Sequence, residues 1–210
     1  MTPLEAIAPY AEFCSRPAAY VAADLEQFHA LLLKWQPAQN LVSRETLAEF
    51  WTRHVADSLQ LLPLIRTTDQ RFLDLGSGGG LPGIPLAIGL RRDHILVDSN
   101  ARKASFLRTV SRELALPVTV LAERIAEIDS RETPDVITAR ALAELPELLE
   151  LIAPLSGPQT RAILHKGREY REELRAASAA WAFDVLEHTS RTDSGGVLLE
   201  IANLRPISVR

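Results

Sequence analysis

Apolar positions at helical spacing fill the first third of this 210-residue chain. One face of the clearest helix is marked by Tyr20, Ala23, Leu25, Phe28, Leu31, Leu32 and Trp35. We expect Pro37 to end this helix. Thr46 and Glu49 then predict a capping box for a second helix. Because no strand pattern precedes Arg71, residues 1–65 are predicted to form an N-terminal helical cap.

From residue 71 onward, short apolar runs alternate with amphipathic stretches. The predicted strands are residues 71–75, 94–98, 117–121, 135–138 and 161–165. The predicted helices between them are residues 83–90, 101–115 and 144–153, with a short turn or helix near 124–128. Alternation of this kind is typical of an α/β fold with a parallel, doubly wound sheet.

The pattern changes after the fifth predicted strand. A charged helix is predicted over 168–179, and two apolar runs, Ala182–Glu187 and Val197–Ala202, then flank a Gly-Gly turn. Two strands around such a turn predict an antiparallel hairpin. Residues 66–210 are therefore predicted to form a Rossmann-like domain whose mostly parallel sheet ends in that hairpin, which is the outline of class I methyltransferases.

A glycine-rich stretch, FLDLGSGGGLPGIP at residues 72–85, joins the first predicted strand to the next helix. Glycines supply positive φ angles without a Cβ, so such a turn forms a nest of backbone N–H groups. It lies at the carboxyl end of a strand, which is where open α/β sheets bind ligands. The stretch is thus the first candidate for a binding site.

Two ligand classes fit the glycine spacing. Dinucleotide-binding proteins use G-x-G-x-x-G, which is present as Gly78, Gly80 and Gly83. Enzymes that use S-adenosylmethionine (SAM) have an acid two residues before G-x-G-x-G, which is present as Asp74, Gly76, Gly78 and Gly80. The acid favours SAM, because a carboxylate there suits the methionine ammonium and repels a pyrophosphate. Asp98, after the next strand, can hold ribose hydroxyls in either class.

His54, Asp57 and Ser58 share one helix face at spacings i, i+3 and i+4. A Ser-His-Asp hydrolase is disfavoured, because one helix does not aim all three groups at a carbonyl and the chain has no G-x-S-x-G motif. Two interpretations stay open. The face holds an internal His–Asp hydrogen bond, or it lines the mouth of the glycine-loop site.

Arg140 and Lys166 each follow a predicted strand directly, which places them on the ligand side of the sheet. We take both as candidate catalytic residues that form a small basic rim. An ordinary surface position is the alternative for Arg140.

Composition narrows the class of protein. The formal net charge of −4 gives no overall attraction to nucleic acid, so RNA binding would need a local basic face. Cys14 is the only cysteine, so we expect neither an internal disulfide nor a cysteine-rich metal site, which suits a reducing compartment. The first residues lack a signal-peptide pattern and no apolar run reaches membrane-spanning length, so we expect a cytoplasmic protein with no membrane partner.

Several stretches together resemble the bacterial 16S ribosomal RNA guanine-N7 methyltransferases, also called glucose-inhibited division protein B. In chain order they are W-x4-NL-x-S at Trp35–Ser43, RHVADSL at Arg53–Leu59, DLGSGGGLPGIPLA at Asp74–Ala87, DSNARKASFLR at Asp98–Arg108, ERIAEI at Glu123–Ile128, TARALAEL at Thr138–Leu145 and HKG at His165–Gly167. Departures from the family pattern occur at Val42-Ser43 and at Asn100–Lys103.

The resemblance implies methyl transfer from SAM to N7 of guanine 527 in the 16S rRNA of the small ribosomal subunit, with S-adenosylhomocysteine as the product. By analogy, Gly76 and Leu81 bind SAM, Asp98 meets its ribose, and Ile125 and Ala126 flank its adenine. Arg140 would lie by the methionine end and the target guanine. We expect the protein to act as a monomer.

The expected chemistry needs no general base, because guanine N7 carries a free lone pair at neutral pH. Two other classes remain open. A nucleotide-dependent oxidoreductase of the short-chain type would need Tyr-x-x-x-Lys, which is absent. A non-catalytic protein that binds SAM or the ribosome could keep the same fold.

Overall fold

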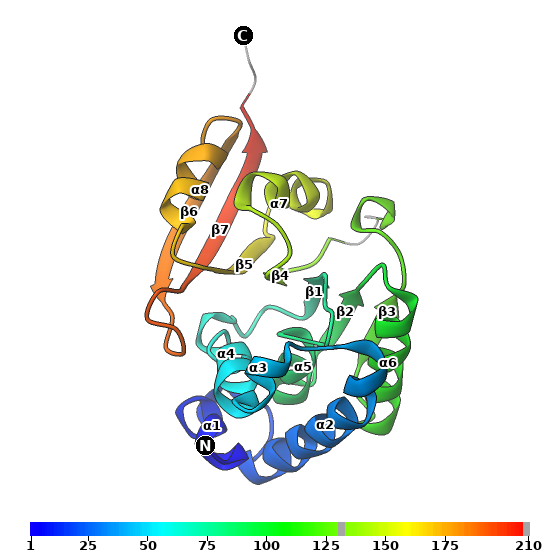
Figure 1. Cartoon of the computed structure of the whole chain (residues 1–210). Helices are drawn as coiled ribbons and strands as arrows, with labels where there is room; N and C mark the ends of the chain where they lie inside the picture. Colours follow the sequence, from blue (N-terminus) through cyan, green and yellow to red (C-terminus); the bar gives the residue numbers. More distant parts are fainter. Residues whose placement is uncertain (130–132, 208–210) are drawn as a thin grey trace.

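The computed structural model describes residues 1–129 and 133–207. Its centre is a seven-stranded sheet with the strand order β3-β2-β1-β4-β5-β7-β6 (Figure 1). The strands are β1 Arg71–Leu75, β2 Asp93–Val97, β3 Val118–Leu121, β4 Val136–Arg140, β5 Arg161–Lys166, β6 Trp181–Thr189 and β7 Val197–Pro206. Strands β1 to β5 are parallel, whereas β7 is antiparallel to β5 and β6. The predicted fold class is confirmed.

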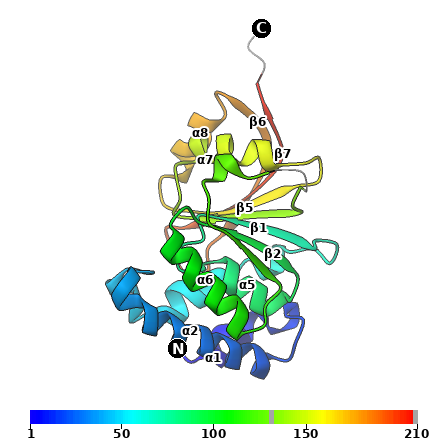
Figure 2. The same ribbon diagram turned by 90° about the vertical axis from the view of Figure 1, so that its right-hand side faces the viewer.

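The parallel strands are apolar on both faces because helices cover both sides of the sheet. In Figure 2, α5 (Gly83–Leu90) and α6 (Ala101–Glu113) lie on one side, and α7 (Leu145–Ile152) and α8 (Tyr170–Ala177) lie on the other. Neighbouring residues of β1 accordingly enter different hydrophobic clusters: Phe72 packs with the first helix pair and Leu73 with the second.

All the elements before β1 are helical, and β1 is the first strand of the described chain. These helical elements are α1 (Pro3–Ile7), η1 (Ala8–Phe13), α2 (Ala18–Gln39), α3 (Arg44–Leu47), the π-helical turn η2 (Trp51–Ala56), α4 (Asp57–Leu59) and η3 (Leu62–Leu64). One hydrophobic cluster contains residues of both α2 and α6, with the Phe28 and Phe106 rings 6.4 Å apart. The cap therefore completes the core on one side of the sheet.

Two predictions about the cap are wrong. Pro37 does not end α2, which continues to Gln39 and stops at Asn40, where the backbone is left-handed. A proline in the last turn removes only one intrahelical hydrogen bond, so the helix tolerates it there. The cap of the next helix is Ser43, whose Oγ accepts from the N–H of Thr46, instead of the predicted Thr46–Glu49 box.

The strand register brings the carboxyl ends of four strands together. Leu75 of β1 lies beside Val97 of β2 and Ala139 of β4, and Arg140 lies beside His165 of β5. Segments that follow these strands therefore meet at one edge of the sheet. Within the described residues, no helix is long and apolar enough to cross a membrane.

Candidate active site

The glycine loop between β1 and α5 forms a cradle at this edge. Gly76, Gly78 and Gly80 have φ angles of 65°, 56° and 86°, which side chains rarely adopt. The N–H of Ser77 donates to Val97 O at 2.9 Å, which fixes the loop to β2. A Cβ at Gly78 would have only Gly76 O, at 3.7 Å, within contact range. The loop is thus open at Gly78, where a ligand can approach the backbone.

Asp98 connects this loop to the next one. Its carboxylate accepts from the N–H of Gly78 and from the N–H of Asn100, both at 2.8 Å. Each oxygen keeps a second lone pair, which a ribose hydroxyl can use. The predicted position of Asp98 beside the cradle therefore fits a ribose contact.

Asp74 lies beneath the loop and is only 1% exposed. Its Oδ1 accepts from Thr138 Oγ1 at 2.7 Å, whereas Oδ2 has no hydrogen-bond partner among the described residues. Burial raises the pKa of Asp74 to about 6, although the hydrogen bond from Thr138 opposes this shift. A buried carboxylate with one unpaired oxygen gives the cradle the sign of potential that a methionine ammonium requires.

Arg140 is held by the helical cap. One terminal nitrogen donates to Asp57 Oδ2 at 3.1 Å and to Arg53 O at 3.2 Å, and the other lies 3.2 Å from His54 Nδ1. Because a guanidinium only donates, His54 Nδ1 must accept, so its Nε2 carries the hydrogen and donates to Thr46 Oγ1 at 2.9 Å. Burial, followed by the charge of Arg140, lowers the pKa of His54 to about 4.

Asp57 connects three parts of the chain. Its Oδ1 accepts from Thr192 Oγ1 at 2.5 Å, in the β6–β7 turn, and from Gln60 Nε2 at 2.8 Å. Its backbone oxygen accepts from His165 Nε2 of β5 at 2.9 Å. Arg140 therefore bridges His54 and Asp57. The Ser58 hydroxyl donates to the backbone oxygen of His54 at 2.7 Å, so it is not placed as a nucleophile.

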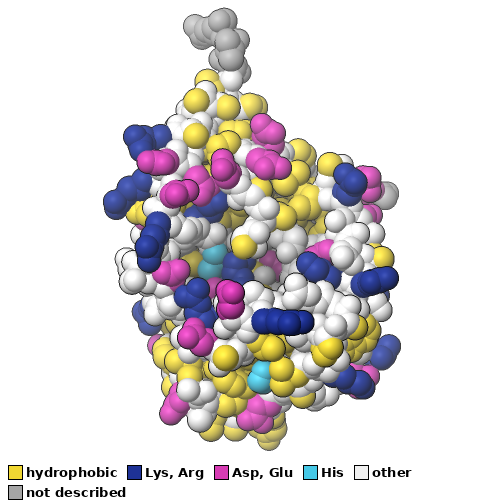
Figure 3. Space-filling model, viewed as in Figure 1, with side chains coloured by type: hydrophobic (Ala, Val, Ile, Leu, Met, Phe, Trp, Pro, Cys, Tyr) yellow, Lys and Arg dark blue, Asp and Glu magenta, His cyan; other side chains and the backbone are white. Residues whose placement is uncertain are grey.

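His54, Asp57, Arg140 and Thr192 line a cleft of about 460 Å³, here called the polar cleft. Its walls come from the cap, from the ends of β4 and β5 and from the β6–β7 turn, and include Val42, Arg53, Arg140, His165 and Asp193. Figure 3 shows a hollow near the centre of one face with histidine and basic side chains in it. The helix face at His54 thus lines the polar cleft, whose walls among the described residues include none from the glycine loop, and Arg140 bridges His54 and Asp57 there.

Lys166 also lines the polar cleft, but its charged end is engaged inside the protein. Its side chain is 7% exposed, its Nζ donates to Ala143 O at 2.9 Å, and it forms an ion pair with Glu173. The other predicted cofactor residues lie near the cradle's edge of the sheet. Leu81 is buried in the glycine loop, and Ile125 and Ala126 form the short turn η4 (Ile125–Glu127) after β3.

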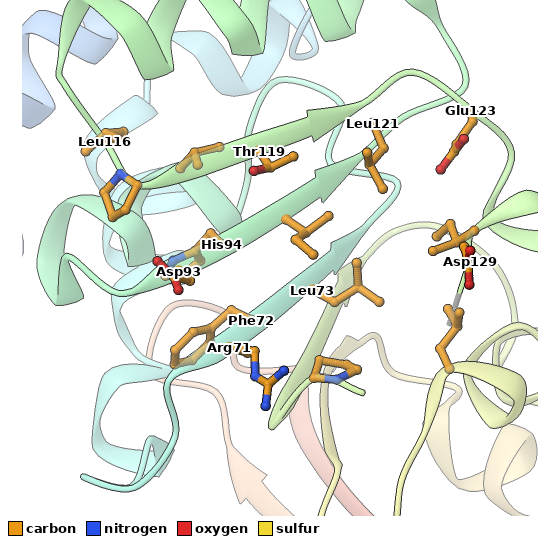
Figure 4. Close-up of a pocket in the computed structure, with 16 residues that line it drawn as sticks. Arg71, Phe72, Leu73, Asp93, His94, Leu116, Thr119, Leu121, Glu123 and Asp129 are labelled. Atoms are coloured by element: carbon orange, nitrogen blue, oxygen red, sulfur yellow. The ribbon is translucent and has the colours of Figure 1, made fainter. Parts of the chain in front are cut away.

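A second cleft, of about 790 Å³, lies over β1, β2 and β3 (Figure 4). It exists because the described connection from β3 to β4 contains only η4, so no helix covers this part of the sheet. Its walls include Leu73, Leu121 and the strand-start residues Arg71 and Asp93. None of the predicted site residues lines it, whereas Arg140 and Lys166 both line the polar cleft.

Comparison with known proteins decides the family. A family model described as rRNA small subunit methyltransferase G (GidB) matches residues 21–198. The chain belongs to this family. Proteins named ribosomal RNA small subunit methyltransferase G are similar to it: that of Bartonella tribocorum is 49% identical over 87% of each chain, and that of Brucella ovis is 44% identical over 88% of each.

Solved structures show the same fold at low sequence identity. An O-methyltransferase from Bacillus cereus in complex with S-adenosylhomocysteine has a TM-score of 0.56 at 18% identity, covering 84% of this chain and 91% of that one. A TehB-like SAM-dependent methyltransferase from Corynebacterium glutamicum has a TM-score of 0.56 at 16% identity, covering 84% and 98%. The fold is that of class I SAM-dependent methyltransferases, and family membership makes SAM, not a dinucleotide, the cofactor.

Several residues of the site were not predicted from the sequence. Thr138 carries a local signal, because it is a polar residue near the end of an apolar strand. Thr192 and Gln60 carry none, since their contacts to Asp57 depend on how the hairpin turn meets the cap. Glu173 lies in a charged helix whose sequence suggests a solvated surface.

Proposed function

We propose that this protein transfers the methyl group of SAM to N7 of guanine 527 in the 16S rRNA of the small ribosomal subunit. The observation that carries the proposal is the meeting of an open glycine cradle and an arginine-centred polar cleft at one edge of the sheet. Family membership supports the class of substrate. The proposal places the protein in the cytoplasm and has it act as a monomer.

The residues present fit the cofactor. The backbone of Gly76, Gly78, Gly80 and Leu81 would hold it, with Asp98 accepting from its ribose hydroxyls. Ile125 and Ala126 would flank the adenine, and the buried charge of Asp74 would favour the ammonium. Bound SAM supplies a methyl group on a positively charged sulfur, which is an electrophile.

The chain contributes alignment and not proton transfer. Guanine N7 has a lone pair in its neutral form, so no side chain has to remove a proton. His54 suits this chemistry, because its lowered pKa keeps it neutral at physiological pH. Arg140, held from three sides, would fix the guanine beside the cradle, and exclusion of water from the polar cleft would aid the approach of N7.

RNA would reach the polar cleft across a locally basic border. The exposed Arg53 lines the cleft, and the exposed Arg191 is the neighbour of two residues that line it. Sequence-specific RNA recognition acts mainly on unpaired bases in loops. We therefore expect a single-stranded loop whose guanine enters beside Arg140.

The test is transfer of label from methyl-labelled SAM to small-subunit rRNA, followed by chemical cleavage at N7-methylguanine to map the position. We expect label at guanine 527 with the wild-type protein and none with Gly78→Val, whose side chain would fill the cradle. Tight binding of NAD without binding of SAM would overturn the assignment.

Asp98→Ala tests the cofactor site separately. Loss of hydrogen bonds to a charged acceptor should weaken SAM binding by about 1.5–3 kcal/mol, measured by calorimetry, while RNA affinity stays unchanged. An unchanged dissociation constant for SAM would remove Asp98 from the site.

A further inference from the structure

Two side chains from other elements hold the loop between β4 and α7. Lys166, the last residue of β5, donates from Nζ to Ala143 O at 2.9 Å. Glu173, on α8, accepts at Oε2 from the N–H of Leu145 at 2.7 Å. The two side chains also form an ion pair with each other. The loop 141–145 is therefore fastened at two backbone groups by one connected unit, here called the Lys166–Glu173 pair.

Glu173 supplies what the helix itself lacks. The N-cap residue of α7 is Glu144, whose side chain makes no capping hydrogen bond. The first N–H groups of a helix have no intrahelical partner, and negative charge is favourable beside them. The carboxylate of Glu173 satisfies the N–H of Leu145, so the start of α7 depends on α8.

Lys166 belongs to the lining of the polar cleft, but little of its side chain is exposed and its charged end is already engaged. The side chains of Lys166 and Glu173 are 7% and 17% exposed. A lysine that contacts an RNA phosphate needs a solvent-facing ammonium, and this ammonium is occupied by a carboxylate and a carbonyl oxygen. Removing one member of such a pair leaves a buried charge without its partner.

The held loop reaches the glycine cradle. Leu142 lies within it, and the Leu142 Cδ1 atom is 2.6 Å from the position that a Cβ of Gly76 would take. Leu142 therefore packs directly on the first glycine of the cradle. Arg140 precedes the loop and Ala141 adopts a φ of 51°, so the chain turns sharply between the polar cleft and this contact.

We infer that the Lys166–Glu173 pair positions loop 141–145, and that through Leu142 it shapes the cofactor cradle, with Lys166 making no contact to RNA. Lys166 and Glu173 are thus positioning residues, which act on SAM through the loop. The inference rests on the proposed function for its ligands, and it assigns Lys166 a different role from the basic rim that the sequence suggests.

The test compares Lys166→Met, Glu173→Gln and the double variant by calorimetry with SAM. Each single change should raise the dissociation constant by about tenfold, equivalent to about 1.4 kcal/mol. Because both changes release the same loop, the double variant should be weaker than either single one by no more than about twofold. Lys166→Arg keeps a donor and a charge and should recover most of the affinity.

Two readouts separate positioning from general damage and from RNA contact. Melting temperatures identify variants that are merely unfolded. The slope of log RNA affinity against log salt should match the wild-type slope in Lys166→Met, because no phosphate contact is lost. The matched controls are Arg175→Met and Glu172→Gln, which break an ion pair of α8 with side chains 77% and 76% exposed and should leave SAM affinity unchanged.

An unchanged SAM affinity in Lys166→Met would overturn the inference, and a salt slope lowered by about one unit would show a phosphate contact instead. Strict additivity of the two single changes would also contradict a shared loop. Failure of the wild-type protein to methylate rRNA would refute the proposed function but not this inference, which is measured with SAM alone.

Discussion

Two arginines on neighbouring strands show how the same side chain can serve a site or a core. Arg161 begins β5, is 3% exposed, and donates to Asp69 at 2.5 Å, Glu200 at 2.6 Å and Leu64 O at 3.1 Å. Arg140 ends β4, is 20% exposed, and is held by Asp57, His54 and Arg53 O. Both are well partnered, so the number of partners does not reveal function.

The difference lies in charge and in access. Arg161 faces two carboxylates and has carboxylate partners at both terminal nitrogens, so its charge is neutralised inside the protein. Arg140 faces one carboxylate, which it shares with Thr192 and Gln60, and one neutral histidine. Arg140 also lines the polar cleft. An arginine with one neutralising partner and an open side is available to a ligand, whereas an enclosed one is not.

The largest effect on stability should come from replacing the enclosed arginine, Arg161. Arg161→Met removes the buried cation that Asp69 and Glu200 share, although Glu200 keeps His188 and Asp69 keeps the Arg66 N–H. This should lower the free energy of unfolding by about 3–5 kcal/mol, measured by urea denaturation. Methyl transfer per folded molecule should stay the same. Arg66→Ala is the control, because its side chain is 59% exposed and 3.8 Å from Glu200, and it should cost less than about 1 kcal/mol. Equal losses in both variants would contradict this account.

Arg140→Ala should produce the opposite pattern. We expect methyl transfer to rRNA to fall at least about tenfold, which corresponds to at least about 1.4 kcal/mol of transition-state stabilisation. Its stability loss should be smaller than that of Arg161→Met, because Asp57 keeps the hydrogen bonds from Thr192 and Gln60. A matched control is Arg112→Ala on the outside of α6, where the side chain is 73% exposed. Wild-type activity in Arg140→Ala would move the RNA face elsewhere.

The position of Arg140 could be predicted, but its partners could not. Apolar runs in the sequence show where each parallel strand ends. Because the carboxyl ends of parallel strands lie at one edge of the sheet, the local pattern is enough to place Arg140 at that edge. The same reasoning placed Lys166 at that edge but could not show that Glu173 neutralises it. Asp57 and Thr192 are 135 positions apart, and no periodicity reports such a contact. Side-chain partners depend on how distant elements pack.

Asp74 shows the same limit at a single strand tip. Its spacing to the glycines correctly indicates a SAM enzyme. The pattern does not show that its side chain points under the loop to Thr138, where it is almost wholly buried. Spacing fixes which residues belong to a motif, whereas the sheet register decides which of them reach the surface.

The smallest effect concerns pH and the histidine beside Arg140. The pKa of His54 is lowered from 6.5 to about 4, chiefly by burial, so between these values the unfolded chain binds more protons than the folded one. The stability from neutral His54 is therefore complete above 6.5 and is lost as the pH falls toward 4. Asp74 has the opposite effect on stability as the pH falls, because burial raises its pKa from 3.8 to about 6. His94, whose pKa is also lowered to about 4, would keep part of the acid sensitivity in a His54 variant.

Replacing His54 by asparagine should thus make the free energy of unfolding depend less steeply on pH between about pH 6.5 and pH 5. The slope should change by less than about 1.4 kcal/mol per pH unit. Urea denaturation at both pH values measures this, and identical slopes in the two proteins would show that His54 does not titrate with folding.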